Sequence, residues 1–325
     1  MKINVVEADI SRMGGRQSSI LQFANYFKKL GYEIQFISSF GLQMPECPTK
    51  KAVLEYHNLD TLTFEDFDWD FRLYKRRNNW PKNCDLYFIA SPAWTNISKI
   101  TNIPNITWKI VDWIQCTAPE TVLEFWTNSE IIKSKISNLE KPIYTVRPPY
   151  SYDCFRKKAR MERDIDIIDI ARVNTKEAKG IFKFAEIVKK FNLKAILVVL
   201  IHDNSDLNFM KGLEIPFVYN LPKKKVAEYL GRSKIFFHPS VDESCSISIY
   251  EALNAGCFPI IYDVGAAAEQ LGEKVFWGTA DELIQEGLDF DGDREVFINQ
   301  GKKFDVENIG ETIKQRLEKI ENAVN

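Results

Sequence analysis

The sequence lacks the features that mark a disulfide-rich, membrane-spanning or secreted protein. Its six cysteines form no Cys-x-x-Cys pair, and a chain of 325 residues needs no disulfide framework, so reduced thiols are predicted. No window approaches about 18 consecutive apolar residues, which a membrane-spanning helix requires. The N-terminus, MKINVVEADI, lacks the apolar core of roughly 7–15 residues typical of a signal peptide. We therefore expect a cytoplasmic protein.

The charge is also nearly balanced. Lys and Arg number 43 against 45 Asp and Glu, a net charge of −2, so a nucleic-acid binder with a global basic field is not expected. The chain is 45% hydrophobic and 27% charged, which is typical of a globular protein and excludes a disordered or collagen-like chain. At about 150 residues per domain, this length predicts two domains.

Strands and helices alternate along the whole chain. In the first half, the apolar pattern predicts strands at 3–8, 33–38, 85–90, 107–111 and 143–146, and helices at 18–30, 120–125 and 129–136, the last capped by Ser129. In the second half it predicts strands at 165–171, 195–201, 235–238 and 258–262, and helices at 180–191, 223–230, 247–255 and 306–324. This alternation predicts two doubly wound α/β domains.

The stiff run Arg147-Pro148-Pro149-Tyr150 separates the two halves. We therefore expect domains at 1–148 and 149–325. The last helix, 306–324, is amphipathic and is a candidate to pack back on the first domain.

Residues 235–272 carry the most informative pattern. A buried strand ends at His238, a polar loop follows, and a helix begins near Ser246. In open α/β sheets, ligands bind at the carboxyl ends of strands, where helix N-termini attract phosphate. Glu243 lies in this loop and Glu251 lies two turns into the helix, so one can face a sugar and the other a ribose. A capping acid and a solvated helix acid are the alternative.

The same stretch resembles the C-terminal signature of retaining GT-B glycosyltransferases of family 4. The matching residues are Pro239, Ser240, Glu243, Glu251, Ala252, Gly256, Pro259, Ile260 and Ile261, and the two glutamates keep the family's E-x7-E spacing. The resemblance implies that Glu243 lies by the donor sugar and that Glu251 holds the nucleotide ribose. It also implies that Ser244, Cys245, Ser246 and Ile247 contact the donor.

A second match opens the C-terminal domain. A strand ends in Arg172, and a Lys179-Gly180 pair precedes the next helix, as in the same family. Two cations there would neutralise the charge on a departing diphosphate. Lys176 is the substitute if the loop register differs, and a solvated surface residue is the alternative for either cation.

The N-terminal half matches the family at fewer positions. Gly14-Gly15 after the first strand resembles the glycine pair that approaches substrate and diphosphate, although a plain turn explains it equally well. Asn128-Ser129-Glu130 and the proline-rich exit at 146–149 also match. Residues 40–83 match nothing in the family.

The resemblance implies a GT-B fold, with two Rossmann-like domains facing each other across a cleft. The first would bind a saccharide or lipid-linked acceptor and the second a nucleotide-diphosphate sugar. It implies retaining transfer in glycan or cell-surface polysaccharide synthesis, with no metal cofactor and with Arg172 and Lys179 stabilising the diphosphate. One alternative is a non-catalytic nucleotide-sugar or glycan-binding protein. A dinucleotide-dependent dehydrogenase is disfavoured because no G-x-G-x-x-G follows the first strand of either half.

Two departures from the family pattern stand near the expected reaction centre. Val111 occupies the position of a frequent family histidine, and none of His57, His202 and His238 obviously replaces it, so Asp112 is the candidate acid or base. Ser244-Cys245-Ser246 also replace the usual Gly-Phe-Gly after the first glutamate. Either departure can alter acceptor chemistry.

Residues 69–82 form the one basic patch of the sequence. Five cations alternate with four aromatic residues: Arg72, Lys75, Arg76, Arg77 and Lys82 with Trp69, Phe71, Tyr74 and Trp80. A solvated segment, a grip for an anionic acceptor or membrane surface, and a nucleic-acid contact all fit this composition.

Two acidic runs resemble metal sites. The Asp-x-Asp spacings at 66–70 can hold a divalent metal, but an acidic surface loop is the stronger prediction. The acidic run at 289–293 is expected to be a turn, because it lacks the ligand pattern of a calcium loop.

Overall fold

The computed structural model describes residues 1–9, 14–39, 50–57, 59–68, 80–90, 101–108, 120–272 and 280–324. The chain divides into two compact units. Unit 1 comprises Met1–Tyr150 together with Val306–Asn325, and unit 2 comprises Ser151–Asp305. The chain therefore passes between the units twice, and the first crossing lies two residues beyond the predicted boundary.

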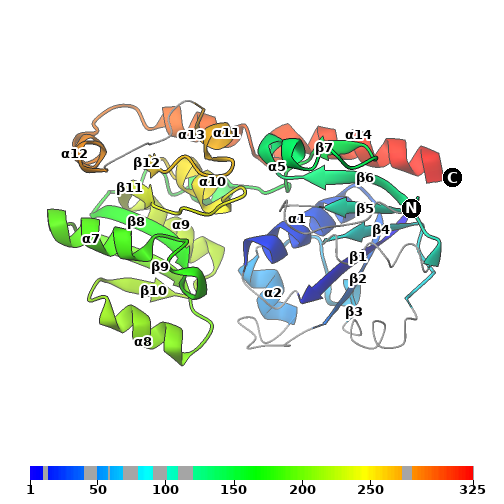
Figure 1. Ribbon diagram of the computed structural model, residues 1–325, viewed down its shortest axis with the longest axis horizontal. Coiled ribbons are helices and arrows are strands. Elements are labelled where there is room, and N and C mark those ends of the chain that lie inside the picture. The colour runs from blue at the N-terminus through cyan, green and yellow to red at the C-terminus, as the bar shows by residue number, and fades with distance from the viewer. Residues whose placement is uncertain are drawn as a thin grey trace. The chain divides into compact units, whose positions relative to one another are not determined.

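Unit 1 is built on a seven-stranded parallel sheet in the order β3-β2-β1-β4-β5-β6-β7 (Figure 1). It opens with the predicted βαβ unit: β1 (Lys2–Asp9), α1 (Gly15–Lys29) and β2 (Glu33–Ser39). The other elements are α2 (Lys50–Tyr56), the 3-10 helix η1 (Phe64–Asp66), β3 (Phe67–Asp68), β4 (Leu86–Ile89), β5 (Asn105–Trp108), β6 (Val122–Thr127), α5 (Glu130–Lys135), β7 (Ile143–Thr145) and α14 (Val306–Val324).

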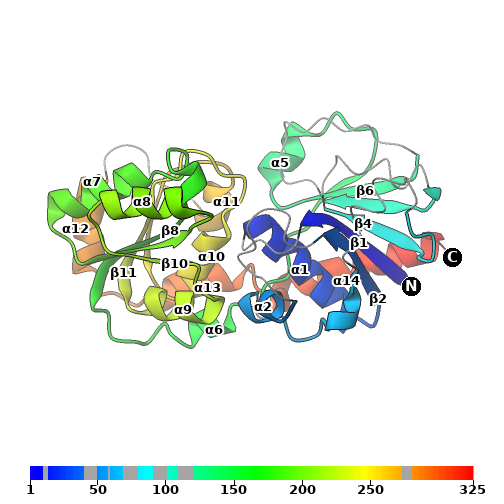
Figure 2. The same cartoon turned by 90° about the horizontal axis from the view of Figure 1, so that it is seen from below.

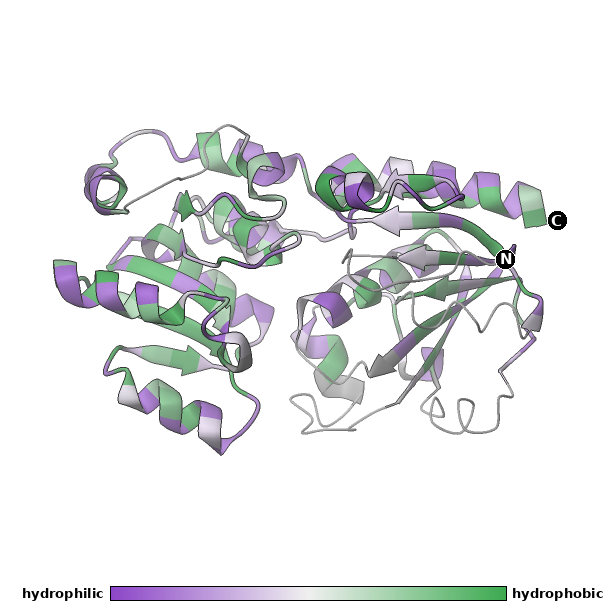
Figure 3. Ribbon diagram, in the orientation of Figure 1, coloured by the Kyte–Doolittle hydropathy of each residue, from purple (hydrophilic) through white to green (hydrophobic). Residues whose placement is uncertain are grey.

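The two faces of this sheet are covered by different side chains, because successive residues of a strand point to opposite faces. Phe23 and Phe27 of α1 pack with Phe88 and Trp126 on one face. A smaller cluster covers the other face and contains Val6, Ile37, Trp80, Tyr87 and Ile89. Figure 3 shows hydrophobic residues running along the strands of each sheet. Both faces of this sheet are therefore buried, as is usual for a parallel sheet.

Helix α14 belongs to unit 1, although it ends the chain. Its Ile313, Leu317 and Ile320 lie in the same buried cluster as α1. The N-terminal ammonium pairs with Glu321 at 3.3 Å, so the two chain ends lie side by side (Figure 1). Among the described residues, no helix is long and apolar enough to cross a membrane.

Three predictions for unit 1 are wrong. The helix predicted at 120–125 is strand β6, because its large β-branched and aromatic residues pair between β5 and β7. Asp66 is not on an acidic surface loop: it is buried, accepts two hydrogen bonds from Lys28 at 2.7 and 2.6 Å, and caps η1. Trp80 is buried in the smaller cluster, so it is unavailable to an exposed basic patch. Lys82 of that patch is exposed, and residues 69–79 lie outside the described residues.

Unit 2 has a five-stranded parallel sheet in the order β10-β9-β8-β11-β12. Its elements are α6 (Asp153–Arg156), β8 (Ile165–Arg172), η3 (Val173–Thr175), α7 (Ile181–Phe191), β9 (Ala195–Leu200), α8 (Asn204–Gly212), β10 (Phe217–Tyr219), α9 (Lys223–Gly231), β11 (Ser233–His238), α10 (Ile247–Asn254), β12 (Phe258–Ile261), α11 (Ala267–Leu271), α12 (Asp281–Asp289) and α13 (Glu295–Lys302). Figure 2 shows α7 and α8 on one side of this sheet and α9 on the other. The predicted alternation of strand and helix is confirmed.

Candidate active site

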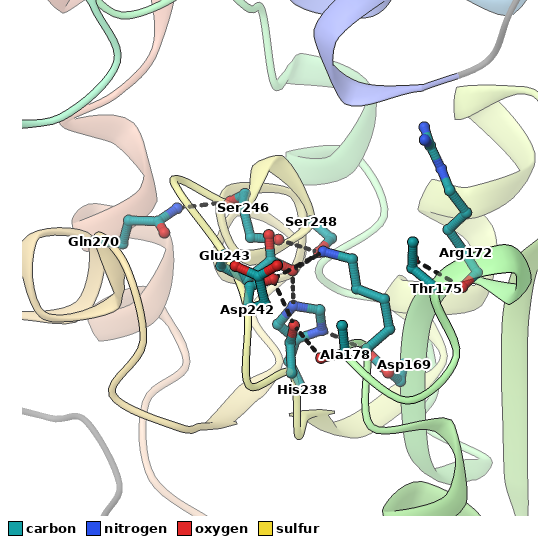
Figure 4. Close-up of polar contacts among 12 residues, drawn as sticks. Asp169, Arg172, Thr175, Ala178, His238, Asp242, Glu243, Ser246, Ser248 and Gln270 are labelled. Carbon is teal, nitrogen blue, oxygen red and sulfur yellow. Dashed lines mark hydrogen bonds and ion pairs between the residues drawn. The ribbon is translucent and has the colours of Figure 1, made fainter. Parts of the chain in front are cut away.

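The candidate site lies where the strand order of the second sheet reverses. The chain runs outward from β8 to β10 and then returns to place β11 on the other side of β8. At such a point the loops after the two neighbouring strands diverge and leave room for a ligand. Here β8 ends at Arg172 and β11 ends at His238, so both predicted motifs begin at this edge (Figure 4).

The loop after β8 is tied to the loop after β11. The Val241 backbone N–H donates to the Ala178 carbonyl at 2.8 Å, and the Ser240 hydroxyl donates to the same carbonyl at 3.0 Å. Gly180 lies at the closest approach: its φ is +67°, and a Cβ would lie 2.1 Å from the carbonyl oxygen of Pro239. Glycine alone satisfies both constraints. The residue before Gly180 is thereby held against the second loop.

That residue, Lys179, contacts Glu243. Its Nζ lies 2.5 Å from Glu243 Oε1 and 3.5 Å from the carbonyl oxygen of Asp242. The carboxylate is largely enclosed, with 12% of the Glu243 side chain exposed. A close ion pair in such an enclosed place fixes both side chains. The structure therefore brings together two of the residues that the sequence singled out.

The Glu243 loop is also held from the side of β12. The Ala266 backbone N–H donates to the Ser244 carbonyl at 2.9 Å, and the Gln270 amide donates to the Ser246 carbonyl at 2.7 Å. Gly265 has a φ of +58°, and a Cβ there would lie 2.0 Å from the Glu243 carbonyl oxygen. The position of Glu243 is therefore set from two neighbouring loops.

His238 lies beneath Glu243 and is fully enclosed. Its Nε2 lies 2.9 Å from Glu243 Oε1, and its Nδ1 lies 2.8 Å from Asp169 Oδ1 on β8 (Figure 4). Burial alone lowers the pKa of a histidine, but the charge and hydrogen bond of Asp169, with a smaller effect of Glu243, raise it to about 9. His238 is therefore an imidazolium at neutral pH.

Glu243 responds in the opposite direction. Burial alone raises the pKa of a carboxyl group, but the hydrogen bond and charge of His238, followed by Lys179, lower it to about 2. Glu243 is thus an anion held between two cations. It suits hydrogen-bond acceptance from a hydroxyl, not proton donation.

Helix α10 begins directly after this loop. The hydroxyls of Ser246 and Ser248 lie 2.9 Å apart, and Cys245 Sγ lies 3.3 Å from the Tyr250 hydroxyl. The predicted donor-contacting residues 244–247 therefore form the first turn of the helix and its approach. The N–H groups of a first turn, with the helix dipole, favour a phosphate.

Glu251 lies on α10 and is buried. It forms an ion pair with Lys223, the first residue of α9. The sequence predicted Glu251 as a ribose ligand but gave no partner for it. Lys223 is thus an addition to the candidate site, and it compensates the burial of this carboxylate.

The two remaining cations are placed differently. Figure 4 shows the Arg172 side chain extending away from Glu243 and His238. The substitute, Lys176, lies 4.5 Å from the ring centre of Phe209 on α8. Lys179, and not Lys176, is therefore the lysine beside Glu243.

The predicted residues of unit 1 are only partly described. Gly14 is the N-cap of α1, and its carbonyl accepts from the Ser18 N–H at 3.0 Å. Just after Gly15, Arg16 makes a two-pronged ion pair with the buried Glu7 on β1, with Nε 3.0 Å from Oε2. This pair fixes the helix start to the strand. Val111 and Asp112 lie outside the described residues.

Sequence reasoning missed Asp169, His238, Gln270 and Gly265. A signal was present for two of them, since Asp169 interrupts the apolar run 167–171 and His238 ends the apolar run 235–237. Nothing local marks Gln270 or Gly265, because their role arises from a contact between separate loops. Within the described parts of the chain, no cluster of three His, Cys, Asp or Glu residues forms a metal site.

The comparisons with known proteins concern the family and the fold. Residues 154–303 match the family model described as "Glycosyl transferases group 1", and this span includes every site residue of unit 2 described above. No curated protein matches the sequence.

Solved structures resemble the whole chain. A glycosyltransferase from Rickettsia africae ESF-5 is 16% identical, with a TM-score of 0.66 over 99% of this chain and 98% of that one. HepE from Anabaena, in complex with UDP and glucose, is 14% identical, with a TM-score of 0.70 over 98% and 99%. Sucrose-phosphate synthase from Thermosynechococcus elongatus is 12% identical, with a TM-score of 0.69 over 99% and 100%. The predicted GT-B fold and the resemblance to GT-B glycosyltransferases are confirmed.

Proposed function

We propose that this chain is a retaining glycosyltransferase that moves a sugar from a nucleotide-diphosphate sugar to a saccharide or lipid-linked acceptor, in glycan or cell-surface polysaccharide synthesis. The observation that carries the proposal is the Lys179–Glu243 pair at the reversal point of the second sheet. A cation suits a diphosphate, and an enclosed carboxylate suits sugar hydroxyls. The family match over the same residues supports this assignment.

The proposed chemistry begins with the loss of the diphosphate. When the bond from the anomeric carbon to the phosphate oxygen breaks, negative charge builds on the leaving group. Arg172 and Lys179 are proposed to stabilise that charge, so the reaction needs no metal cofactor. The acceptor hydroxyl attacks from the leaving-group face, and its proton passes to the donor phosphate. Asp112 is the candidate for an additional base.

The nucleotide is proposed to lie along α10. Its phosphates approach the first turn at residues 244–247, and its ribose hydroxyls bond to Glu251 farther along the helix. Two solved structures support UDP as the first nucleotide to test. HepE from Anabaena binds UDP and glucose, and a pneumococcal O-GlcNAc transferase binds UDP and GlcNAc.

A thermal-shift screen tests the donor class. UDP, GDP, ADP and CMP, each with its sugar conjugates, are added at rising concentrations. At 100 times its dissociation constant, a true ligand adds about 2.7 kcal/mol of stability. The matching nucleotide sugar is then incubated with a panel of saccharide acceptors, with and without EDTA. Turnover that survives EDTA supports metal-independent transfer, and retention is measured from the anomeric configuration of the product.

Two substitutions test the assignment of the site. Glu251→Gln and Arg172→Ala should each reduce donor binding or turnover tenfold or more, about 1.4 kcal/mol. Glu228→Gln and Arg160→Ala, which alter exposed parts of the same unit, should leave both unchanged. Normal transfer by both site variants would refute the assignment. Tight nucleotide binding with no turnover in the unaltered protein would instead identify a non-catalytic nucleotide-sugar-binding protein.

Contact between residues 69–82 and an anionic membrane stays a prediction. It is tested by sedimentation with vesicles that contain phosphatidylserine, compared with vesicles of phosphatidylcholine alone. Binding to the anionic vesicles alone would support a peripheral location at the inner face of the membrane.

A further inference from the structure

The arrangement around His238 determines the protonation of its ring. Each ring nitrogen faces one carboxylate oxygen, at 2.8 Å from Asp169 and 2.9 Å from Glu243. An ionised carboxylate only accepts hydrogen bonds, and a neutral imidazole has a single N–H to donate. The geometry therefore requires a doubly protonated ring that donates to both carboxylates.

This imidazolium is almost completely shielded from solvent, since 1% of its side chain and 0% of the Asp169 side chain are exposed. A buried charge is costly unless it is paired. The pairing here extends into a series of alternating charges: Asp169, His238, Glu243 and finally Lys179, whose side chain is 23% exposed. His238 is the only member that contacts both carboxylates, so it links the buried end of the series to the open end.

The two cations contact the same atom of Glu243. His238 Nε2 and Lys179 Nζ both bond to Oε1, at 2.9 and 2.5 Å. Oε2 makes no hydrogen bond to any residue that the structure describes. The carboxylate plane is thus fixed by one oxygen, while the other is free to accept from a ligand.

We infer that His238, anchored by Asp169, is a positioning residue that fixes Oε1 of Glu243 so that Oε2 accepts a hydrogen bond from one hydroxyl of the donor sugar. This inference rests on the proposed function. It adds two residues to the machinery of sugar recognition, and neither of them reaches the sugar. It also assigns separate tasks to the two oxygens of one carboxylate.

The inference predicts a split between nucleotide binding and turnover. His238→Gln removes the central charge while keeping a hydrogen-bonding side chain of similar length. We expect kcat for the nucleotide sugar identified by the screen to fall at least tenfold. The Kd of the free nucleoside diphosphate should stay within threefold, because α10 and Glu251 are unchanged. His202→Gln, a histidine of the same unit outside this series, is the matched control and should alter neither quantity.

A monodeoxy series of the same donor separates positioning from a general structural effect. In the unaltered protein, removal of one particular hydroxyl should slow turnover tenfold or more. In His238→Gln the same removal should cost less than threefold, because the acceptor oxygen is already misplaced. Asp169→Asn, which leaves the histidine in place, should show the same loss of sensitivity and serves if His238→Gln fails to fold.

The outcomes distinguish this inference from the function on which it rests. If the unaltered protein turns over no nucleotide sugar, the proposed function fails and this inference fails with it. If it turns over a donor and His238→Gln retains normal kcat, the inference alone is overturned. Equal sensitivity to every deoxy donor in the variant and the unaltered protein overturns it in the same way.

Discussion

Gly180 is constrained both by its backbone conformation and by its packing. Its φ of +67° and the 2.1 Å separation between an added Cβ and the Pro239 carbonyl both exclude a side chain. Gly180→Ala should therefore lower the free energy of unfolding of unit 2 by about 2 kcal/mol or more. Because the loop must shift, Lys179 should move as well, and turnover should fall together with stability. Denaturant unfolding and donor turnover measure the two effects.

Gly212 provides the control for that substitution. It ends α8 in the same unit, and nothing lies within 4 Å of an added Cβ. Gly212→Ala should leave stability unchanged or raise it by up to about 1 kcal/mol, since alanine favours a helix. Equal effects of the two substitutions would show that the contact with Pro239 is not a constraint.

The charge series also predicts a pH dependence of stability. The pKa of His238 is raised from 6.5 to about 9, so its stabilising contribution is complete below pH 6.5 and is lost as the pH rises through 9. The pKa of Glu243 is lowered from 4.5 to about 2, so its contribution is complete above pH 4.5 and is lost as the pH falls through 2. Since His238 and Glu243 contact each other directly, these two groups titrate as a coupled pair.

The measurement is the stability difference between the unaltered protein and His238→Gln. That difference should be largest between about pH 4.5 and 6.5 and should shrink toward pH 9. Comparing the two proteins cancels the titration of groups elsewhere in the chain. A difference that stays constant from pH 6 to pH 10 would contradict a buried imidazolium.

At the scale of residues, the sequence predicted Lys179 and Glu243 but not the contact of Glu243 with His238. The two predicted residues belong to motifs with a recognisable spacing, so they can be identified from the sequence alone. Asp169 and His238 acquire their role only because β8 and β11 are neighbours in the sheet. Asp169 and His238 are 69 positions apart in the sequence. Their contact is set by the topology of the sheet, and the local sequence pattern does not encode that topology.

At the scale of elements, α14 is held to the sheet of unit 1 by a largely buried ion pair. Arg316 pairs with the buried Glu124 on β6, with Nε 3.2 Å from Oε1, and its guanidinium lies 3.5 Å from the ring centre of Tyr144 on β7. Arg316→Ala would leave the carboxylate buried and without that cation, which costs about 3 kcal/mol or more. We expect the free energy of unfolding of unit 1, measured by urea denaturation, to fall by this amount.

A double substitution identifies the cause. Glu124→Gln keeps an acceptor for the Trp126 indole N–H, which now donates to Glu124 at 2.5 Å. Adding it to Arg316→Ala removes the uncompensated charge and should recover part of the loss. Lys314→Ala, which removes an exposed pair 3.9 Å from Glu318, should cost less than about 0.5 kcal/mol. No recovery in the double variant would indicate lost packing of the arginine as the cause.

The elements that sequence pattern failed to predict share a physical feature. The sequence pattern predicts a helix at 120–125, where the structure has β6, because a run of only six residues of mixed polarity fits either structure. The long, periodic elements were predicted because their burial pattern extends over several turns, as in α7 and α14. The elements without a prediction span nine residues or fewer, and their conformation depends on neighbours in the fold: α2, β3, α6, α8, β10, α11, α12 and α13.

At the scale of the whole molecule, sequence reasoning predicted two α/β halves because strand–helix alternation repeats in both. It could not settle where the last helix packs, since an amphipathic face identifies no partner. The structure places α14 with unit 1, through Ile313, Leu317 and Ile320. Unit 1 is therefore assembled from both ends of the chain, and unit 2 is a continuous insertion between them.

This discontinuity leads to a testable prediction: the last helix should unfold with unit 1, although it follows unit 2 in the sequence. Leu317→Ala removes a fully buried side chain of unit 1 and should cost about 2–5 kcal/mol. Leu230→Ala removes an equally buried one from α9 of unit 2.

Tryptophan fluorescence reports on unit 1, because the Trp residues at 69, 80, 94, 108, 113 and 126 fall within it and only the one at 277 does not. Leu317→Ala should therefore shift the fluorescence transition to lower urea and leave nucleotide binding by the native protein unchanged. Leu230→Ala should instead lower the free energy of unfolding of unit 2, which is the quantity that bound nucleotide raises. If Leu317→Ala weakened nucleotide binding and left the fluorescence transition in place, the last helix would belong to unit 2 after all.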